Sequence, residues 1–380
     1  MQAIRFPQVD FSSQLVSDLI ELERVRLDFR TEALDDPFIL ELRRLFQGLT
    51  SMMSARIEGN RTTVSDVVAE ARRAKITGDQ AVDAVREILQ LEEATEYIER
   101  LAAQGRLELS HVLVRDLHRM SVNGLEREGD PHPGSYRQGS VAIAGATHLP
   151  PGPNSVQPDM DQLLEFANRE VQPQYQLLQV ALVHHRFVWI HPFTNGNGRV
   201  SRLLTYAMLI KRGYTSRSTA RPLNPTAVFG ADRQAYYHHL AQADSLSDDS
   251  ALAWCGYVIR GLRDDLASVT HLADRSYVVD QVFAEALNTA IAHGTLAQSD
   301  GDVLYEVARR GTSKAGELSE VIPGTLSSRS QKLGRLVKSG FLQKVGKPQK
   351  YAISLWQNDL TIHVVQRLDE LGMLPSILRD

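Results

Sequence analysis

The chain has 380 residues, of which 43% are hydrophobic and 23% are charged, which is enough for a substantial core and one or two accessory domains. Its formal net charge is −4, yet residues 301–355 hold ten Lys or Arg against four Asp or Glu, so this part is a basic module. The single cysteine, Cys255, excludes an internal disulfide. Neither a basic-then-apolar leader nor an uninterrupted apolar run of about eighteen residues is present, so we expect a cytoplasmic protein without membrane contact.

The first strongly patterned segment is an apolar-periodic run that begins at Phe38 and predicts a helix. Near its end, Ser54 and Glu58 are four residues apart, which places both on one helix face. Gly59 directly afterwards is the residue type expected just past a helix end. On these residues alone, a solvated helix face is the simpler interpretation.

Residues 134–153 contain the best strand candidate ahead of the basic module. Val141 and Ile143 alternate with small residues between Gly139 and Gly145, and several prolines follow. This pattern predicts a short surface hairpin whose unpaired edge could accept an extended peptide. A plain connecting loop is the alternative.

A glycine-rich turn follows a helix predicted over residues 175–190. Gly196 and Gly198 flank Asn197 and allow a backbone in which successive N–H groups point into one concavity. The apolar run over residues 200–213 predicts a helix whose N-terminus faces that concavity. Backbone amides and the helix dipole would together favour a phosphate there.

Two arginines and a histidine flank this turn. Arg199 and Arg202 are three residues apart on the first helical turn, where their planar guanidinium groups can bind phosphate oxygens bidentately. His191 ends the preceding helix and can serve as a general base near neutral pH. A tight turn between two core helices is the alternative. A zinc site from His184, His185 and His191 is another, although no HExxH motif or cysteine partner accompanies them.

The basic module predicts helices over residues 303–310, 315–321 and 325–340, followed by two short strands around Gly346 within residues 341–355. This is the layout of a winged helix, whose third helix would be the recognition helix. The polar residues of that third helix are Ser327, Ser328, Arg329, Ser330, Lys332 and Arg335. DNA contact is one interpretation, and a solvated face, an acidic protein partner or a second copy of the chain are the others.

The segment from His191 to Arg202 resembles the signature of the Fic family, His-x-Phe-x-(Asp/Glu)-Gly-Asn-Gly-Arg-x-x-Arg, at every fixed position except Asn195. The resemblance implies a helical core that transfers part of a nucleotide, usually the AMP of ATP, to a hydroxyl side chain of a target protein. It makes His191 the base that deprotonates the target Ser, Thr or Tyr, and Phe193 the buried anchor of the loop. The implied phosphate ligands are Gly196, Asn197 and Gly198 as the anion cradle, Arg199 on the β-phosphate side and Arg202 near the γ-phosphate.

The segment from Ser54 to Gly59 takes on a role through the same resemblance. It is similar to the motif (Ser/Thr)-x-x-x-Glu-(Gly/Asn) of one class of Fic proteins, in which the glutamate pairs with the second arginine of the signature. Here Glu58 would pair with Arg202 and block the productive pose of the γ-phosphate. Such a charge-assisted contact is suited to a switch.

Two further segments resemble parts of the family's active site. Residues 134–153 resemble the hairpin flap that registers the target segment, so Val141 and Ile143 would contact nucleotide and target. Tyr236 and Tyr237 resemble the paired tyrosines that line the adenine pocket, although buried core tyrosines explain them equally well. Asp244 stands where an asparagine that contacts the base would be expected.

Asn195 occupies the position of an acidic residue that, in the family, binds the Mg²⁺ bridging the α- and β-phosphates. A neutral amide lacks the charge that dominates Mg²⁺ binding, so Mg²⁺, or Mn²⁺ in its place, would be weakly held. Three functions stay open: a slow AMP-transferase that relies on a phosphate-bound metal, a Fic variant with another donor or reaction such as de-AMPylation, and a nucleotide-binding pseudoenzyme.

We therefore expect a mainly α protein in three parts. Residues 1–100 would form an N-terminal helical segment with the inhibitory motif, residues 101–270 a Fic-type helical bundle with a short β-hairpin flap, and residues 271–380 a linker and winged helix-turn-helix domain. The expected function is an autoinhibited protein adenylyltransferase that takes ATP as substrate and modifies a protein target. The alternative is a pseudoenzyme that regulates through DNA bound by residues 301–355, and the sequence leaves a homodimer open.

Overall fold

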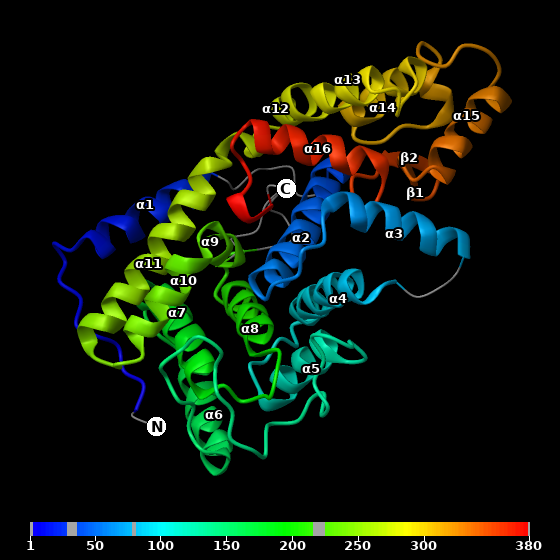
Figure 1. Ribbon diagram of the computed structural model, residues 1–380. Coiled ribbons are helices and arrows are strands. Elements are labelled where there is room, and N and C mark those ends of the chain that lie inside the picture. Colours follow the sequence, from blue (N-terminus) through cyan, green and yellow to red (C-terminus); the bar gives the residue numbers. More distant parts are fainter. Residues whose placement is uncertain (1–2, 29–35, 78–80, 216–224, 379–380) are drawn as a thin grey trace.

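The computed structural model describes residues 3–28, 36–77, 81–215 and 225–378, and it is built mainly from helices, as expected (Figure 1). The first helices are α1 (Gln14–Asp28), α2 (Pro37–Ile57), α3 (Val64–Thr77), α4 (Asp83–Ala103) and α5 (His111–Val122). The middle helices are α6 (Pro153–Asn168), α7 (Pro173–Ile190), α8 (Asn197–Lys211), α9 (Pro225–Ala231), α10 (Arg233–Ala243) and α11 (Asp248–Ser268). Within the described ranges, none of the helices combines the length and apolar character that crossing a bilayer requires.

The C-terminal elements are α12 (Arg275–Tyr277), α13 (Ala284–Ala292), α14 (Gln298–Arg310), α15 (Leu326–Lys338) and α16 (Asp359–Glu370), with strands β1 (Leu342–Val345) and β2 (Lys350–Ile353). A π-helical turn, Val278–Phe283, joins α12 to α13, and short 3-10 turns cover Thr270–Ala273, Ala315–Leu318 and Ser376–Leu378. The two strands are antiparallel, with Leu342 opposite Ile353. The element order follows the expectation for this module, except that its second helix is reduced to the turn Ala315–Leu318.

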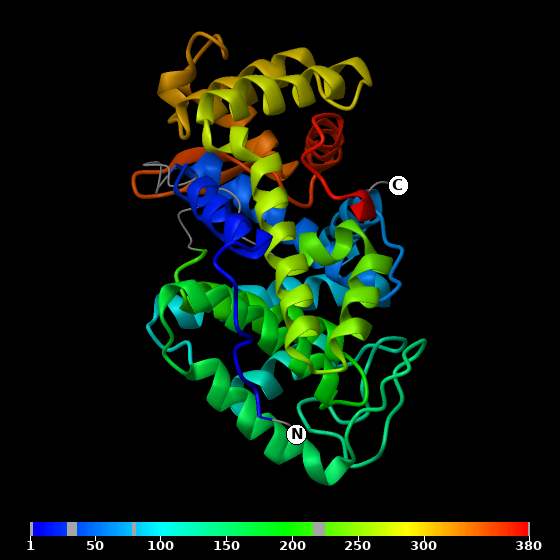
Figure 2. The ribbon, with the colours of Figure 1, turned by 90° about the vertical axis from the view of Figure 1, so that its left-hand side faces the viewer.

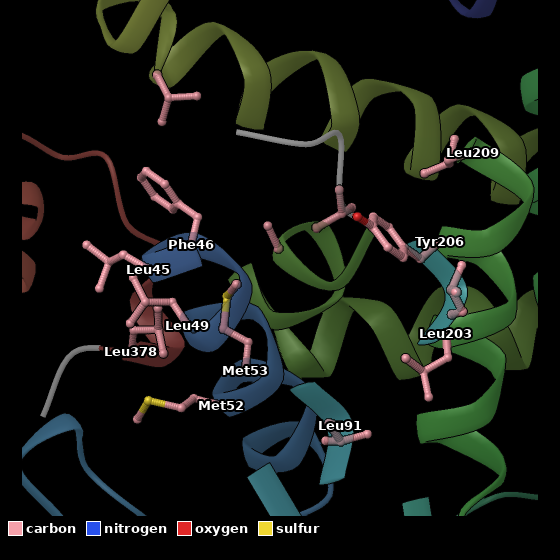
Figure 3. Packing of buried hydrophobic residues seen from close by; sticks show 14 of the residues in the cluster. Leu45, Phe46, Leu49, Met52, Met53, Leu91, Leu203, Tyr206, Leu209 and Leu378 are labelled. Atoms are coloured by element: carbon pink, nitrogen blue, oxygen red, sulfur yellow. The ribbon is translucent and has the colours of Figure 1, made fainter. Parts of the chain in front are cut away.

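The long helix α2 lies between the middle helices and the C-terminal elements (Figures 1 and 2). It begins where the Asp36 carboxylate accepts the N–H groups of Phe38 and Ile39, with Pro37 at the first helical position. It ends at Ile57 with Glu58 as its cap, and the next residue, Gly59, has a φ of 100°, a conformation that glycine adopts readily. Figure 3 shows the side chains that α2 contributes to a continuous hydrophobic cluster, together with those of α4, α8 and the C-terminal segment: Leu45, Phe46, Leu49, Met52, Met53, Leu91, Leu203 and Leu378.

Helices α7 and α8 form the centre of the middle part and are joined by the glycine-rich turn. The expected helix over residues 175–190 is confirmed as α7, which starts at Pro173 and is buried on most sides, as a core helix must be. It ends at His191, whose backbone takes the left-handed conformation with φ 53°. Helix α8 then begins at Asn197, directly after Gly196 with φ 76°.

The prediction of a β-hairpin flap was wrong for this structure. Residues 134–152 form a loop with turns and contain no strand, and Val141 and Ile143 are half-buried in it. Prolines lack the N–H that a ladder needs, and within this described segment the two arms share no ladder beyond the turn bond from the Ala146 N–H to the Ile143 carbonyl at 3.1 Å. Instead, the Arg137 guanidinium binds the carbonyl oxygens of both Gly139 and Pro151. The alternation of Val141 and Ile143 with small residues therefore lies in a loop whose two ends are held together by the Arg137 side chain.

The C-terminal elements dock on α2 and α4 through an aromatic side chain and two carboxylates. The Trp356 ring covers Gly48, and its Nε1 donates to Glu92 of α4 at 3.1 Å. Glu41 of α2 accepts from the Leu355 N–H at 3.1 Å and from the Gln343 side chain at 2.6 Å. These contacts tie β1 and the segment after β2 to the middle of α2.

Replacing Gly48 by alanine is expected to destabilise the protein by about 1–3 kcal/mol, the usual cost of overpacking a close contact. A Cβ at this position would lie 2.2 Å from two carbon atoms of the Trp356 ring, so the ring must move. The matched control is Gly256→Ala on α11, where an added Cβ meets no atom within 4 Å and should stabilise by up to about 1 kcal/mol. Equal thermal midpoints for the two variants would contradict this packing.

Candidate active site

The signature turn is held rigid by its own side chains. Phe193 is fully buried, and its ring stacks on that of His118 from α5 with centroids 3.7 Å apart and planes 6° apart. Asn197 accepts the Phe193 N–H at 2.9 Å and donates to the Phe193 carbonyl at 2.8 Å. The Asn197 side chain thus closes the turn, while its backbone begins α8.

His118 ties this turn to the preceding loop, a role that its sequence position does not indicate. Its Nδ1 accepts the Gly134 N–H at 2.9 Å, so its Nε2 carries the proton and faces the Asn195 carbonyl at 3.2 Å. Burial lowers the pKa of His118 to about 4, which keeps the ring neutral at pH 7. The Asp130 carboxylate accepts the Asn195 N–H at 3.0 Å and completes the support of the turn.

His191 has the geometry and the protonation state of a general base. Its Nδ1 lies 3.2 Å from the Val188 carbonyl and therefore carries the proton, which leaves the Nε2 lone pair free. Burial lowers the pKa of the imidazole to about 4, against a smaller opposite effect of the Val188 carbonyl. The ring is consequently unprotonated at neutral pH.

The expected ion pair between Glu58 and Arg202 is present. Arg202 donates from Nη2 to Glu58 Oε1 at 2.7 Å and from Nε to Ser54 Oγ at 2.8 Å, and its guanidinium is almost fully buried. Burial alone would raise the pKa of the Glu58 carboxyl, but Arg202 and Arg199 hold it below its usual value. Both members of the pair are thus charged, and the cap of α2 is tied to α8.

The Glu58 carboxylate lies against the first turn of α8. A Cβ placed on Gly198 would be 2.1 Å from Glu58 Oε1, so only glycine leaves room for the carboxylate. The N-terminus of a helix is where backbone amides and the helix dipole attract an anion. Glu58 therefore occupies the place that the sequence analysis assigned to a phosphate.

Arg199, expected to bind phosphate oxygens, is bonded to protein groups in this structure. Its side chain is fully buried and donates to Glu87 of α4 at 3.1 Å and to the Ser121 and Glu128 carbonyls at 3.1 and 2.7 Å. Glu87 is held in turn by the Asn60 amide at 2.9 Å, and burial raises the pKa of this carboxyl. The first signature arginine is thus enclosed by protein groups that come from distant segments, which the spacing of the signature could not predict.

Asn195 does not fit the role of a Mg²⁺ ligand. Its Oδ1 accepts the Gly196 N–H at 2.7 Å, and its Nδ2 donates to the Gly129 carbonyl at 3.1 Å, so both ends of the amide are used. Mg²⁺ is normally held by carboxylate oxygens, and the described residues contain no group of three side chains suited to a metal. The Asn195 amide instead fastens the signature turn to residues 128–130.

Replacing Asn195 by aspartate is expected to destabilise the protein by about 1–3 kcal/mol, because an ionised carboxylate cannot donate to the Gly129 carbonyl and would face it. Asn195→Ala removes the same hydrogen bond without adding charge and should cost less. Chemical unfolding of the two variants at pH 7 measures the difference. A stability of Asn195→Asp equal to that of the unmodified protein would show that the turn does not depend on this amide.

The two tyrosines expected at the adenine pocket are placed differently from each other. Tyr236 is 2% exposed, stacks on Phe229 with centroids 4.5 Å apart, and its hydroxyl lies 2.9 Å from His184 Nε2. It therefore packs in the core, and its role at an adenine pocket stays a prediction. Tyr237 is 41% exposed, and its hydroxyl approaches the Ile57 carbonyl at the end of α2. Of the two, Tyr237 is the one on the Glu58 side.

Two of the histidines considered as zinc ligands, His184 and His185, lie within hydrogen-bond distance of other side chains. His184 Nδ1 lies 2.8 Å from Thr205 Oγ1, and His185 Nε2 lies 3.1 Å from the Asp244 carboxylate. Both rings are buried, and burial lowers their pKa values. Asp244 is therefore a partner of a core histidine. Cys255 is also buried, with its thiol 4.0 Å from the Leu178 carbonyl, and burial raises its pKa to about 12.

Comparison with known sequences places this site in a described family. The model of the Fic/DOC family matches residues 108–209. The protein adenylyltransferase Fic of Drosophila willistoni is 31% identical over 193 residues, which are 50% of this chain and 36% of that protein. The protein of the same name from Nematostella vectensis is 29% identical over 195 residues, 50% of this chain and 42% of that protein. The matched region thus covers well under half the length of these relatives.

Solved structures show the same fold. A Fic family protein from Desulfovibrio desulfuricans G20 superposes with a TM-score of 0.58 and 21% identity over 92% of this chain and 98% of that one. Fic-1 from C. elegans gives a TM-score of 0.52 at 19% identity, over 67% of this chain and 71% of that one. The chain therefore contains a Fic/DOC family domain, which residues 108–209 form.

Proposed function

We propose that this chain is an autoinhibited protein adenylyltransferase, which moves AMP from ATP to a hydroxyl side chain of a protein target. The observation that carries the proposal is the Glu58 carboxylate, which lies on Gly198 at the N-terminus of α8 and pairs with Arg202. An anionic phosphate is the natural occupant of that place, so the carboxylate competes with the nucleotide. The relatives that match half of the chain carry the name protein adenylyltransferase, which supports the same activity.

The residues of the site have defined roles in this reaction. His191 Nε2 takes the proton of the target hydroxyl, whose oxygen then bonds to the α-phosphorus of ATP. The bond from that phosphorus to the oxygen bridging to the β-phosphate breaks, and pyrophosphate leaves. Arg202 Nη1 lies beside Gly198 and has no hydrogen-bond partner among the described residues, so it can donate to a phosphate oxygen once Glu58 is displaced. Arg199 is enclosed by protein groups and supports the turn. No step depends on a metal held by Asn195.

The test is transfer of label from α-labelled ATP to protein, for the unmodified chain, Glu58→Gly, and Glu58→Gly combined with Asn195→Asp. Label that appears in Glu58→Gly supports an autoinhibited transferase that works with Asn195. Label that appears only with Asn195→Asp would mean that the natural site binds nucleotide without using it. The pseudoenzyme would then be the better explanation.

The pH dependence follows from the neutral state of His191. In the Glu58→Gly background, kcat/KM is expected to be level from about pH 6 to pH 8, because the working form is the unprotonated imidazole. It should fall at lower pH with a midpoint near the pKa of about 4 that burial gives this ring. Circular dichroism over the same range separates this loss from acid unfolding. A midpoint near the ordinary histidine pKa would contradict a buried base.

The C-terminal module supports DNA binding as a second proposed activity. Apart from Leu326 at its first position, the exposed residues of α15 are small or polar, namely Ser327, Ser328, Ser330, Gln331, Gly334, Arg335 and Lys338. Arg329 and Lys332, expected at the same face, bind the Ile322 carbonyl and Ser299 instead. Fluorescence anisotropy with duplex DNA tests whether the exposed face of α15 contacts DNA. If it does, Arg335→Gln should weaken DNA binding, whereas Arg329→Gln should leave the affinity unchanged.

A further inference from the structure

We infer that Arg137 is a positioning residue for the transfer reaction: its guanidinium holds His191 in its left-handed backbone conformation and fastens the loop of residues 139–151 to it. The inference rests on the proposed role of His191 as the base. It concerns a residue outside the signature, more than fifty positions earlier in the chain.

The contacts of Arg137 join three segments at one buried point. Its Nε donates to the His191 carbonyl at 2.7 Å, and its Nη2 reaches the Ile190 carbonyl at 3.3 Å. Nη1 donates to the Gly139 carbonyl at 2.9 Å and Nη2 to the Pro151 carbonyl at 2.5 Å. The backbone N–H of Arg137 also donates to the Pro192 carbonyl at 2.9 Å. The residue is only 4% exposed, so these carbonyl groups replace water as its partners.

The end of α7 needs such a partner. The last carbonyl groups of a helix have no partner within it, and a cation there also complements the helix dipole. His191 adds a second demand, because a left-handed φ of 53° is unfavourable for any residue with a Cβ. Two donors on the Ile190 and His191 carbonyls fix the peptide orientation from which the imidazole projects.

The planar guanidinium suits this place better than an ammonium group would. Arginine offers five N–H donors in a fixed fork, whereas lysine offers a point charge that cannot reach both the helix end and both loop arms. Among the described residues, the backbone hydrogen bond between the two arms of the loop is the turn bond from the Ala146 N–H to the Ile143 carbonyl at 3.1 Å. At the base of the loop the guanidinium is therefore the shared attachment of the two arms. The loop and the catalytic histidine are therefore positioned by one side chain.

The experiment compares Arg137→Lys with Arg43→Lys, both in the Glu58→Gly background. Arg43 is buried to the same extent and is bonded to Glu99 at 2.6 Å, away from the signature turn. Arg137→Lys is expected to lower kcat by about 10- to 100-fold, since a small misplacement of a base has that effect, with KM for ATP changed by less than about threefold. Amides of residues 139–151 should exchange hydrogen for deuterium faster in Arg137→Lys than in Arg43→Lys.

An unchanged kcat in Arg137→Lys, or an equal loss in Arg43→Lys, would overturn the positioning role. Unchanged exchange over residues 139–151 in both Arg137→Lys and Arg137→Gln would overturn the attachment of the loop. If Glu58→Gly itself transfers no label, the proposed activity fails, and so does the catalytic part of this inference. The exchange measurement still decides the structural part, so the two failures are distinguishable.

Discussion

Replacement of Glu58 by glycine is expected to raise AMP transfer by about 10- to 100-fold. In the unmodified protein the nucleotide must displace the carboxylate from Arg202, and a hydrogen bond between charged groups contributes about 1.5–3 kcal/mol. Removing the carboxylate also clears the space above Gly198 at the start of α8. The measurement is the initial rate of label transfer from α-labelled ATP at fixed enzyme and target concentrations.

Two controls separate this effect from a general loosening of α2. Glu58→Gln keeps a weaker contact with Arg202 and should give an intermediate rate. Glu41→Gln changes another carboxylate of the same helix, one that accepts from Leu355 and Gln343 far from the turn, and should leave the rate unchanged. An unchanged rate of AMP transfer in Glu58→Gly, with Arg202 in place, would contradict the proposed autoinhibition.

Replacement of His191 by alanine in the Glu58→Gly background is expected to lower transfer by about 10²- to 10⁴-fold, the usual contribution of a positioned general base. ATP binding should persist, because the groups that would bind the phosphates belong to α8 and not to the imidazole. Rates of label transfer and calorimetric titration with ATP measure the two properties separately.

The matched control for this variant is His238→Ala, an exposed histidine of α10. Its transfer rate should equal that of the parent Glu58→Gly protein. Transfer that survives His191→Ala would mean that another group, or the hydroxyl without assistance, supplies the proton transfer, and the assignment of His191 would be wrong.

The parts of the fold that the sequence predicted are those encoded in adjacent residues. Helix α7 and the turn after it follow from apolar periodicity and paired glycines. The mainly helical class follows for the same reason, since each helix carries its own pattern. The contact between Glu58 and Arg202 joins distant residues, and it was expected only from the resemblance of both segments to motifs of one family.

The parts that were missed depend on partners far away in the chain. Tyr236 packs on Phe229 and His184, and local sequence cannot distinguish such a core position from the wall of a pocket. The alternation around Val141 predicted strands, but a strand requires a pairing partner, which this loop lacks within the described residues. His118 occupies one position of an amphipathic helix, so nothing in its neighbours indicates that it supports the turn.

Asn195 shows the same limit within the signature itself. The sequence reveals the missing carboxylate, and charge arguments then predict that a metal would be weakly held. Only the structure shows that the amide makes two hydrogen bonds, to Gly196 and to Gly129. Asparagine at position 195 therefore donates a hydrogen bond that stabilises the turn and that an aspartate could not donate.

The docking of the C-terminal elements on α2 has a consequence for how the protein can be divided. The helix that presents Glu58 to the site also presents Gly48 to Trp356 and donates from Arg56 to the Ile377 carbonyl at 2.6 Å. A fragment that stops after α11 would lack both of these partners and would uncover apolar surface of α2. Rates measured on such a fragment would come from a protein in which α2 lacks its C-terminal packing partners. The rate of the autoinhibited state therefore has to be measured on the full chain.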